Sequence, residues 1–297
     1  MRMNIQLKSS GVHAILWSIG QTNFNPRLPI QKEVPMQPLI IIATPNVSWL
    51  HPDVDYPRTP AAIAEEARLC REAGATILHT HAEGKWKETV AAVRARTDIL
   101  VQCGMSSLPI PQRMESFDAR PEMLSIILNH HDEAFVGADF NVLHPKDELL
   151  EYVRLCKKYR VVPEWEVWHS GSIWNLNYLI GKKLLKPPYV TTLFFGWPGG
   201  TWSPPTVEEY LYRRQLMPAG CTCNVSIMGE GQKEILTAAI LMGDHVRVGT
   251  EDLPFDHRGK LVPTHELVGE TAGMARALGR PLATVGQARK MIGQKNH

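Results

Sequence analysis

The sequence has no long apolar run and almost no excess of charge of either sign. A membrane-spanning helix needs about 20 consecutive, mostly apolar residues, and no stretch of this chain approaches that length. The formal net charge is +2, and the lysines and arginines never form a longer run than a pair. Both shortages argue against a membrane span and against a broad basic surface for nucleic acid. We therefore expect small-molecule partners, and neither nucleic acid nor a membrane.

Cysteine is also scarce, with five residues scattered along 297 positions. An odd, scattered set does not make the disulfide framework of a small secreted domain. Cys221 and Cys223 stand close together but lack the second pair that a structural zinc site requires. We therefore expect reduced thiols and a cytoplasmic protein.

No G-x-G-x-x-G motif follows the first apolar run, residues 39–44, which disfavours a dinucleotide-binding domain. From residue 38 onward, apolar strand-like runs alternate with helix-like segments. The predicted strands cover residues 39–44, 76–81, 99–103, 123–128, 161–168, 189–197, 222–228 and 245–250. The predicted helices cover residues 59–73, 88–96, 146–159, 170–185, 207–217, 232–242, 266–278 and 285–292.

This alternation, over about 250 residues, is typical of an α/β protein with a (β/α)8 TIM barrel. We predict a single catalytic barrel over residues 38–297, preceded by an N-terminal arm over residues 1–37. An open, doubly wound sheet is the alternative. The segment between the third and fourth strands is expected to be a Pro-rich connection, and His130 and His131 are expected to lie in a loop.

Two histidines end the second predicted strand, in the sequence Ile77-Leu78-His79-Thr80-His81. Side chains two apart on a strand point to the same side, so the imidazoles of His79 and His81 can converge on one ion. Histidine is a common ligand of zinc and other first-row metals. Two ligands do not hold a metal, however, and two hydrogen-bonded histidines at a strand end are the alternative.

The end of the eighth strand offers a third ligand. Alternation places Arg247 and Glu251 on one face of that strand, and Asp252 follows where the chain turns away. In a barrel, Glu251 can complete a His2Glu set with an open coordination position, which is a catalytic arrangement. Beside a metal and an arginine, Asp252 is expected to have a lowered pKa and to act as a base. The alternative is a buried ion pair of Arg247 with either carboxylate.

Two further strand ends carry candidate residues. Glu164 and Glu166 share a face of an apolar strand, where they could interact with Arg247 or support a metal-bound histidine; a salt bridge in the barrel wall is the alternative. We count Glu166 with Arg247 and Asp252 as a candidate catalytic residue.

Gly199 and Gly200 expose backbone N–H groups suited to an anion or a closely approaching ligand, or they form a plain turn.

From residue 38 to residue 291 the sequence resembles the β-keto acid cleavage enzymes. The matching motifs stand at the strand ends: Ala73-Gly74-Ala75 with His79-Thr80-His81, Arg120-Pro121-Glu122-Met123, residues 161–167 with Ser170-Gly171, residues 196–200, residues 243–252, and residues 279–284. The resemblance implies a (β/α)8 barrel with a divalent metal, usually zinc. It also implies a small-molecule β-keto acid and acetyl-CoA as substrates, acetoacetate and a new acyl-CoA as products, and a homo-oligomer, with a tetramer favoured.

Carried over by the resemblance, His79, His81 and Glu251 would be the metal ligands. Asp252, assisted by Arg247, would remove a proton from the keto acid. The substrate would meet the third-strand turn, with Gly104, Ser106 and Ser107, and the hydroxyl of Ser125. The turn departs from the Ser-Thr-Gly-Gly-like sequence of the family.

Another departure concerns the substrate. Asn46, Val47 and Ser48 stand where the family has an acidic residue that reads an amino group, so we count Asn46 as a substrate-binding candidate and expect a neutral or apolar β-keto acid. Trp49, Trp86 and Trp202 are expected to shape the pocket. A metal-dependent hydrolase and a barrel that binds metal or ligand without turnover remain alternatives.

Overall fold

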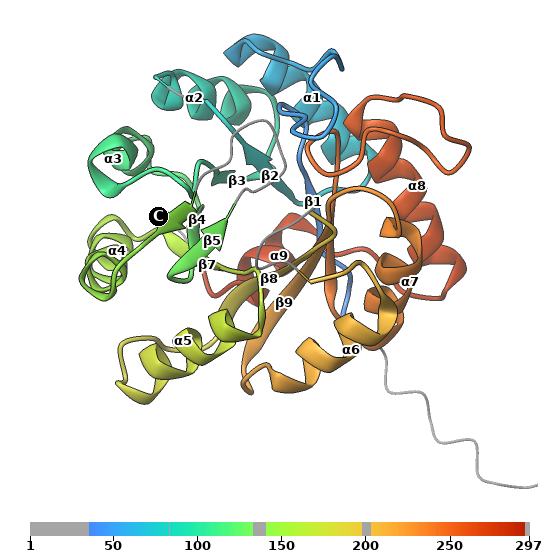
Figure 1. Cartoon of the computed structure of the whole chain (residues 1–297). Helices are drawn as coiled ribbons and strands as arrows, with labels where there is room; N and C mark the ends of the chain where they lie inside the picture. The colour runs from blue at the N-terminus through green and yellow to red at the C-terminus, as the bar shows by residue number, and fades with distance from the viewer. Residues whose placement is uncertain (1–35, 83, 133–140, 198–202, 295–297) are drawn as a thin grey trace, which may run out of the picture. The chain divides into compact units, whose positions relative to one another are not determined.

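The computed structural model describes residues 36–82, 84–132, 141–197 and 203–294. In these residues, eight parallel strands form a closed barrel in the order β1-β10-β9-β8-β7-β4-β3-β2 (Figure 1). The barrel strands are β1 (Ile41–Ala43), β2 (Ile77–Thr80), β3 (Leu100–Cys103), β4 (Met123–Ile127), β7 (Val162–Val167), β8 (Tyr189–Phe195), β9 (Cys221–Ile227) and β10 (His245–Val248). The predicted TIM barrel is confirmed, and the open sheet is excluded because β10 pairs with β1.

The helices alternate with the strands as predicted. They are α1 (Pro60–Ala73), α2 (Trp86–Arg96), α3 (Ile110–Asp118), α4 (Lys146–Tyr159), α5 (Ser170–Gly181), α6 (Val207–Leu216), α7 (Gln232–Met242), α8 (Thr264–Ala277) and α9 (Val285–Met291). The first of them begins where the sequence predicts, because the Thr59 side chain accepts from the backbone N–H of Ala62 and Pro60 occupies the first turn.

Two local predictions are wrong. The expected Pro-rich connection contains a helix, α3. Its prolines, Pro109 and Pro111, lie at the N-terminus of the helix, where proline costs no intrahelical hydrogen bond, so they do not prevent helix formation. His130 and His131 lie in a short strand, β5 (His130–Asp132), that pairs antiparallel with β6 (Asn141–Leu143). A three-residue strand is too short to show a clear alternation of polar and apolar residues. The predicted arm falls almost wholly outside the described residues.

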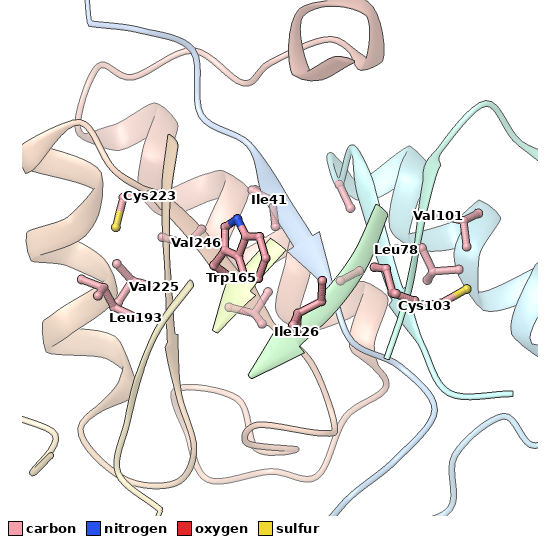
Figure 2. Packing of buried hydrophobic residues seen from close by; sticks show 14 of the residues in the cluster. Ile41, Leu78, Val101, Cys103, Ile126, Trp165, Leu193, Cys223, Val225 and Val246 are labelled. Atoms are coloured by element: carbon pink, nitrogen blue, oxygen red, sulfur yellow. The ribbon is translucent and has the colours of Figure 1, made fainter. Parts of the chain in front are cut away.

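Side chains of the barrel strands alternate between two environments. Ile41, Leu78, Val101 and Val246 belong to the large core between the strands and the surrounding helices (Figure 2). Their neighbours Ile40, Ile42, Ile77 and Leu100 pack in a second cluster together with Ala288 and Ile292 of the α9 segment. This second cluster fills the amino-terminal part of the barrel interior with apolar side chains. The polar residues of the interior therefore gather toward the carboxyl-terminal ends of the strands.

Among the described residues, no helix is both long and apolar enough to cross a membrane.

Candidate metal centre

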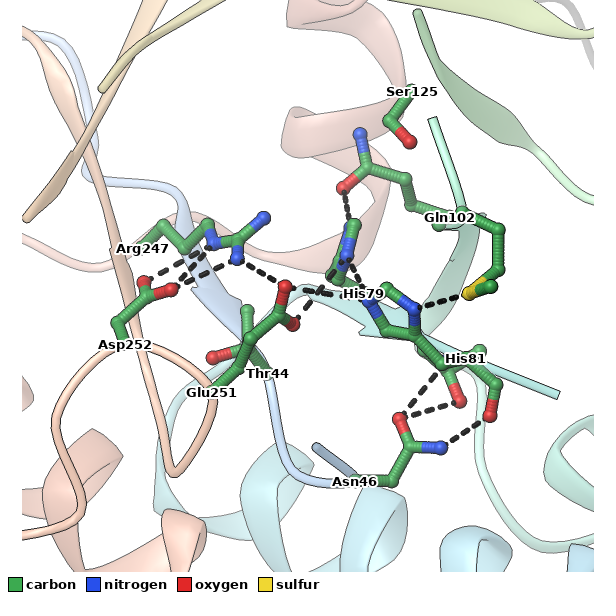
Figure 3. A network of polar contacts seen from close by, with 12 residues as sticks. Thr44, Asn46, His79, His81, Gln102, Ser125, Arg247, Glu251 and Asp252 are labelled. Carbon is green, nitrogen blue, oxygen red and sulfur yellow. Dashed lines mark hydrogen bonds and ion pairs between the residues drawn. The ribbon is translucent and has the colours of Figure 1, made fainter. Parts of the chain in front are cut away.

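Three side chains, from the end of β2 and from the segments that follow β2 and β10, meet at the carboxyl-terminal end of the barrel (Figure 3). One ligand atom from each of His79, His81 and Glu251 lies within 4.8 Å of the other two. The Nε2 atoms of the two histidines are 3.0 Å apart. His79 Nε2 lies 3.5 Å from one oxygen of Glu251, and His81 Nε2 lies 3.3 Å from the other. The structure thus brings together the three residues that the sequence predicts.

The barrel topology explains this convergence. β2 and β10 both pair with β1, so only one strand separates the histidines from Glu251. The chain after β10 passes close to β1: Glu251 donates its backbone N–H to Thr44, and a Cβ at Gly249 would overlap Thr44. Gly249 also has a φ of +154°. Glycine tolerates such close backbone contact, and this contact delivers Glu251 to the histidines.

Hydrogen bonds fix the orientation of His79. Its Nδ1 lies 2.8 Å from the amide oxygen of Gln102, and the amide nitrogen of Gln102 lies 3.0 Å from Glu164. A carbonyl oxygen only accepts hydrogen bonds, so His79 carries its proton on Nδ1 and presents the lone pair of Nε2 to the site. Burial lowers the pKa of His79, which keeps the imidazole neutral, as a metal ligand must be.

The Asn46 side chain and the close approach of Gly104 fix the position of His81. Asn46 accepts from the backbone N–H of His81 at 2.9 Å and from the Thr80 hydroxyl at 3.1 Å, and its amide nitrogen donates to the His81 carbonyl. A Cβ at Gly104 would lie 2.8 Å from the His81 ring and 2.9 Å from His79 Nε2. Gly104 and Asn46, both expected to bind substrate, therefore contact the two histidines or the strand that carries them.

Arg247 forms ion pairs with two consecutive carboxylates. Its Nη2 lies 2.7 Å from Glu251 and 2.8 Å from Asp252. Its Nε donates to both oxygens of Asp252, and the Ser226 hydroxyl donates to Asp252 at 3.0 Å. Both ion pairs considered from the sequence are therefore present, and they coexist with the cluster of His79, His81 and Glu251.

Burial and charge act in opposite directions on these carboxylates. Burial would raise the pKa of Glu251, but the positive charge of Arg247 opposes it, and the pKa lies well below its usual range. For Asp252 burial is the larger effect and raises the pKa to about 6, although Arg247 opposes it. The lowering expected from the sequence assumed a metal ion beside Asp252, so it stays a prediction for the metal-bound site. A base with a pKa nearer to neutrality is nevertheless better matched to proton transfer at pH 7.

The two glutamates of β7 have different partners. Glu164 contacts Gln102, and burial together with the charge of Glu166 raises its pKa to about 8. Glu166 accepts from the Ser106 hydroxyl at 2.9 Å and from the indole N–H of Trp168 at 3.0 Å. The third-strand turn is thereby tied to β7 through Ser106, whose carbonyl also lies 2.8 Å from His144 Nε2.

The other predicted residues are more dispersed. Ser125 is buried, and its hydroxyl donates to the Cys103 carbonyl at 3.3 Å. Trp49 donates to Glu251 at 3.4 Å and packs edge-on against His81, whereas Trp86 is buried in the core between strands and helices. Ser107 is half-buried beyond the third strand. Gly199, Gly200 and Trp202 lie outside the described residues.

Three contributors were missed from the sequence: Gln102, Ser226 and Phe194. Each points inward by the strand alternation, and Phe194 packs its ring 5.1 Å from the Arg247 guanidinium. A buried glutamine in an apolar strand was the available signal for Gln102, because an interior amide requires partners.

The geometry and the donor types fit a divalent ion such as zinc. Two neutral imidazoles and one carboxylate are ligands of catalytic zinc sites, which keep an open position. Arg247 contacts one oxygen of Glu251, while the other oxygen, Oε2, is buried and has no hydrogen-bond partner within the described residues. Asp256, His257 and Glu270 form a second cluster, in which His257 and Glu270 are exposed.

Comparison with known proteins points to one family. A family model described as beta-keto acid cleavage enzyme matches residues 38–293. A 3-keto-5-aminohexanoate cleavage enzyme of Fusobacterium nucleatum subsp. nucleatum is 26% identical over 258 residues, covering 80% of this chain and 91% of that protein. A 3-dehydrocarnitine:acetyl-CoA trimethylamine transferase of Rhizobium meliloti is 22% identical over 269 residues, covering 80% of this chain and 89% of that protein.

A solved structure shares the fold. The apo structure of ObcA superposes with a TM-score of 0.66 at 18% sequence identity, over 80% of this chain. The match covers 65% of the ObcA chain, so this chain spans slightly less than two thirds of that protein. At this identity the likeness supports the barrel alone.

Proposed function

This chain belongs to the beta-keto acid cleavage enzyme family, and from that premise we propose that it transfers an acyl group from a β-keto acid to coenzyme A, with acetyl-CoA as co-substrate. The products are acetoacetate and a new acyl-CoA. One observation carries the proposal: His79, His81 and Glu251 converge at the carboxyl-terminal end of a closed barrel, directly beside the Arg247–Asp252 pair. The name of the Rhizobium meliloti relative, which includes acetyl-CoA, supports this co-substrate.

His79, His81 and Glu251 would hold the metal ion. A bound zinc ion supplies Lewis acidity, which polarises a carbonyl oxygen and makes the neighbouring C–H more acidic. Asp252 takes the proton from the carbon between the keto and carboxylate groups of the substrate. Arg247 holds Asp252 in place through Nε and Nη2 and balances the negative charge that Asp252 carries before it takes the proton.

The atoms balance without any further reactant. The carbanion attacks the acetyl carbonyl of acetyl-CoA, a C–C bond forms, and the CoA thiolate leaves. The thiolate then adds to the keto carbon, and the bond between that carbon and the original α-carbon breaks. The α-carbon departs with the acetyl group and regains a proton as acetoacetate, while the remaining acyl group stays on CoA. Hydrogen-bond donors near each oxyanion lower these barriers.

The surroundings support a neutral or apolar substituent on the keto acid. Asn46, which stands where the family carries an acidic residue, uses its amide to hydrogen-bond the backbone of His81. Trp49 flanks Glu251 and His81, and Trp168 stacks on Phe194 at the barrel mouth. Asn46 offers an ammonium-bearing substituent a neutral amide in place of a carboxylate.

Incubation of zinc-loaded protein with acetyl-CoA and a panel of β-keto acids tests the reaction. The panel should pair straight-chain and aromatic keto acids with amino-bearing analogues of equal length. Acetoacetate and the matching acyl-CoA should form in equal amounts, with larger kcat/KM for the apolar member of each pair. If fully metal-loaded protein yields no acetoacetate from any of them, the proposed reaction is wrong. Size-exclusion chromatography with light scattering checks the expected homo-oligomer.

A further inference from the structure

A line of hydrogen bonds inside the barrel leads from β7 to the candidate metal centre. Glu164 Oε2 accepts from the Gln102 amide nitrogen at 3.0 Å, and the Gln102 amide oxygen lies 2.8 Å from His79 Nδ1. All three side chains are buried, with Gln102 only 1% exposed. Figure 3 shows the contact between Gln102 and His79, on the side of the imidazole opposite to Glu251.

The orientation of the Gln102 amide determines which nitrogen of His79 carries the proton. The two ends of a glutamine amide differ, because the nitrogen only donates and the oxygen only accepts. With the nitrogen turned toward Glu164, the oxygen faces His79 and requires a proton on Nδ1. A neutral imidazole has one N–H, so Nε2 is left with its lone pair directed at His81 and Glu251. In the other tautomer Nε2 would carry the proton and could not bind a metal.

The environment of Gln102 makes a purely space-filling role unfavourable. The adjoining interior layer is apolar and contains Ile42, Ile77, Leu100 and Met123. Burying an amide in such a place costs free energy unless its groups are hydrogen-bonded, so an apolar side chain of similar volume would pack there at lower cost.

We propose that Gln102 is a positioning residue that holds His79 in its Nδ1–H tautomer and thereby directs Nε2 to the metal, with Glu164 fixing the orientation of the Gln102 amide. This inference rests on the proposed metal-dependent function. It goes beyond it by assigning the choice of tautomer to a residue that does not itself touch metal or substrate. Partners of this kind commonly change metal affinity by about 10–100-fold when they are removed.

The direct test uses the unaltered protein. Long-range ¹H–¹⁵N spectra of ¹⁵N-histidine-labelled protein, stripped of metal with a chelator, report which ring nitrogen of His79 carries the proton; His79→Gln identifies the signal. We expect the Nδ1–H tautomer. An Nε2–H tautomer for His79 at pH 7–8 would overturn the inference whatever the enzyme's activity.

Variants provide the second test. Gln102→Leu should lower Zn²⁺ affinity about 10–100-fold in chelator competition and should shift His79 toward the other tautomer. Gln102→Glu keeps an acceptor oxygen for Nδ1 and should restore affinity to within a few-fold. Gln232→Leu is the matched control, since the Gln232 amide donates to the Ile227 carbonyl. Wild-type affinity and tautomer in a folded Gln102→Leu protein would contradict the role.

The two proposals fail in distinguishable ways. Protein that binds zinc with His79 in the Nδ1–H tautomer but forms no acetoacetate would refute the proposed reaction and leave the role of Gln102 intact. Protein that forms acetoacetate while Gln102→Leu retains normal affinity would do the reverse.

Discussion

The Nε2 atoms of His79 and His81 lie 3.0 Å apart and both face the carboxylate of Glu251. The rings reach this position from one strand, since two residues along β2 return a side chain to the same face. His79 is held from behind by Gln102, and the His81 backbone is held by Asn46. Hydrogen bonds from the protein itself therefore orient the pair, which is the arrangement expected of a site that must bind metal and leave room for substrate.

Replacement of His81 tests the metal centre. His81→Ala removes one of three ligand atoms, so zinc measured by elemental analysis after dialysis should fall from about one per chain to a small fraction of that value. His265→Ala serves as the control, because His265 pairs with Glu66 away from the barrel interior. Equal zinc content in the two variants would remove His81 from the ligand set.

Asp252→Asn tests the proposed base. The amide has nearly the same shape as the carboxylate, and Glu251 remains to balance Arg247, so metal content should be unchanged. The turnover number should drop by about 10²–10⁴-fold, the usual contribution of a positioned general base. Substantial activity would shift the role to another group, and Glu166 is the other carboxylate named as catalytic from the sequence.

A methyl group at position 104 should disturb both imidazoles. The added Cβ of Gly104→Ala would lie within 2.9 Å of ring atoms of His79 and His81, well inside van der Waals contact. We expect weaker zinc binding in chelator competition, with a far-ultraviolet circular dichroism spectrum like that of the wild type. Gly181→Ala is the control, since nothing lies within 4 Å of its added Cβ. Zinc affinity equal to that of the control would show that the imidazole rings can move away from the added methyl group without weakening zinc binding.

His245 should make the fold sensitive to acid. Burial, and then the charge of Arg280, lower its pKa to about 3, and its Nδ1 accepts from the backbone N–H of Ile40. In the unfolded chain His245 therefore binds a proton as the pH falls below about 6.5, whereas in the folded chain it stays neutral until the pH approaches 3. The stability that His245 contributes is present above pH 6.5 and is lost progressively as the pH falls toward 3.

Urea unfolding at pH 7, 6 and 5 measures this effect. A neutral histidine costs up to about 1.4 kcal/mol of unfolding free energy for each pH unit below 6.5. His245→Asn keeps an acceptor for Ile40 but cannot be protonated, so its stability should fall less steeply with decreasing pH. Parallel pH dependences for the variant and the wild type would show that His245 does not titrate as described.

The sequence by itself determined much of this protein. The alternation of apolar runs with amphipathic segments predicts the barrel, because the spacing of apolar residues differs between a buried strand and a helix. The spacing of His79 and His81 placed both rings on one face. The prolines before and within α3 concealed a helix, since the same residues also terminate helices and form loops.

Tertiary structure decided the rest. Closure of the barrel puts β10 beside β1, and only this brings Glu251 to His81, 170 positions away in the chain. Burial raises the pKa of Asp252, and the extent of that burial depends on the closed barrel rather than on neighbouring residues in the sequence. The contact of Gln102 with both Glu164 and His79 joins three strands across the barrel interior, and no spacing along one strand could reveal it. Ligand types are a property of sequence, whereas their tautomers and charges depend on which neighbours folding supplies.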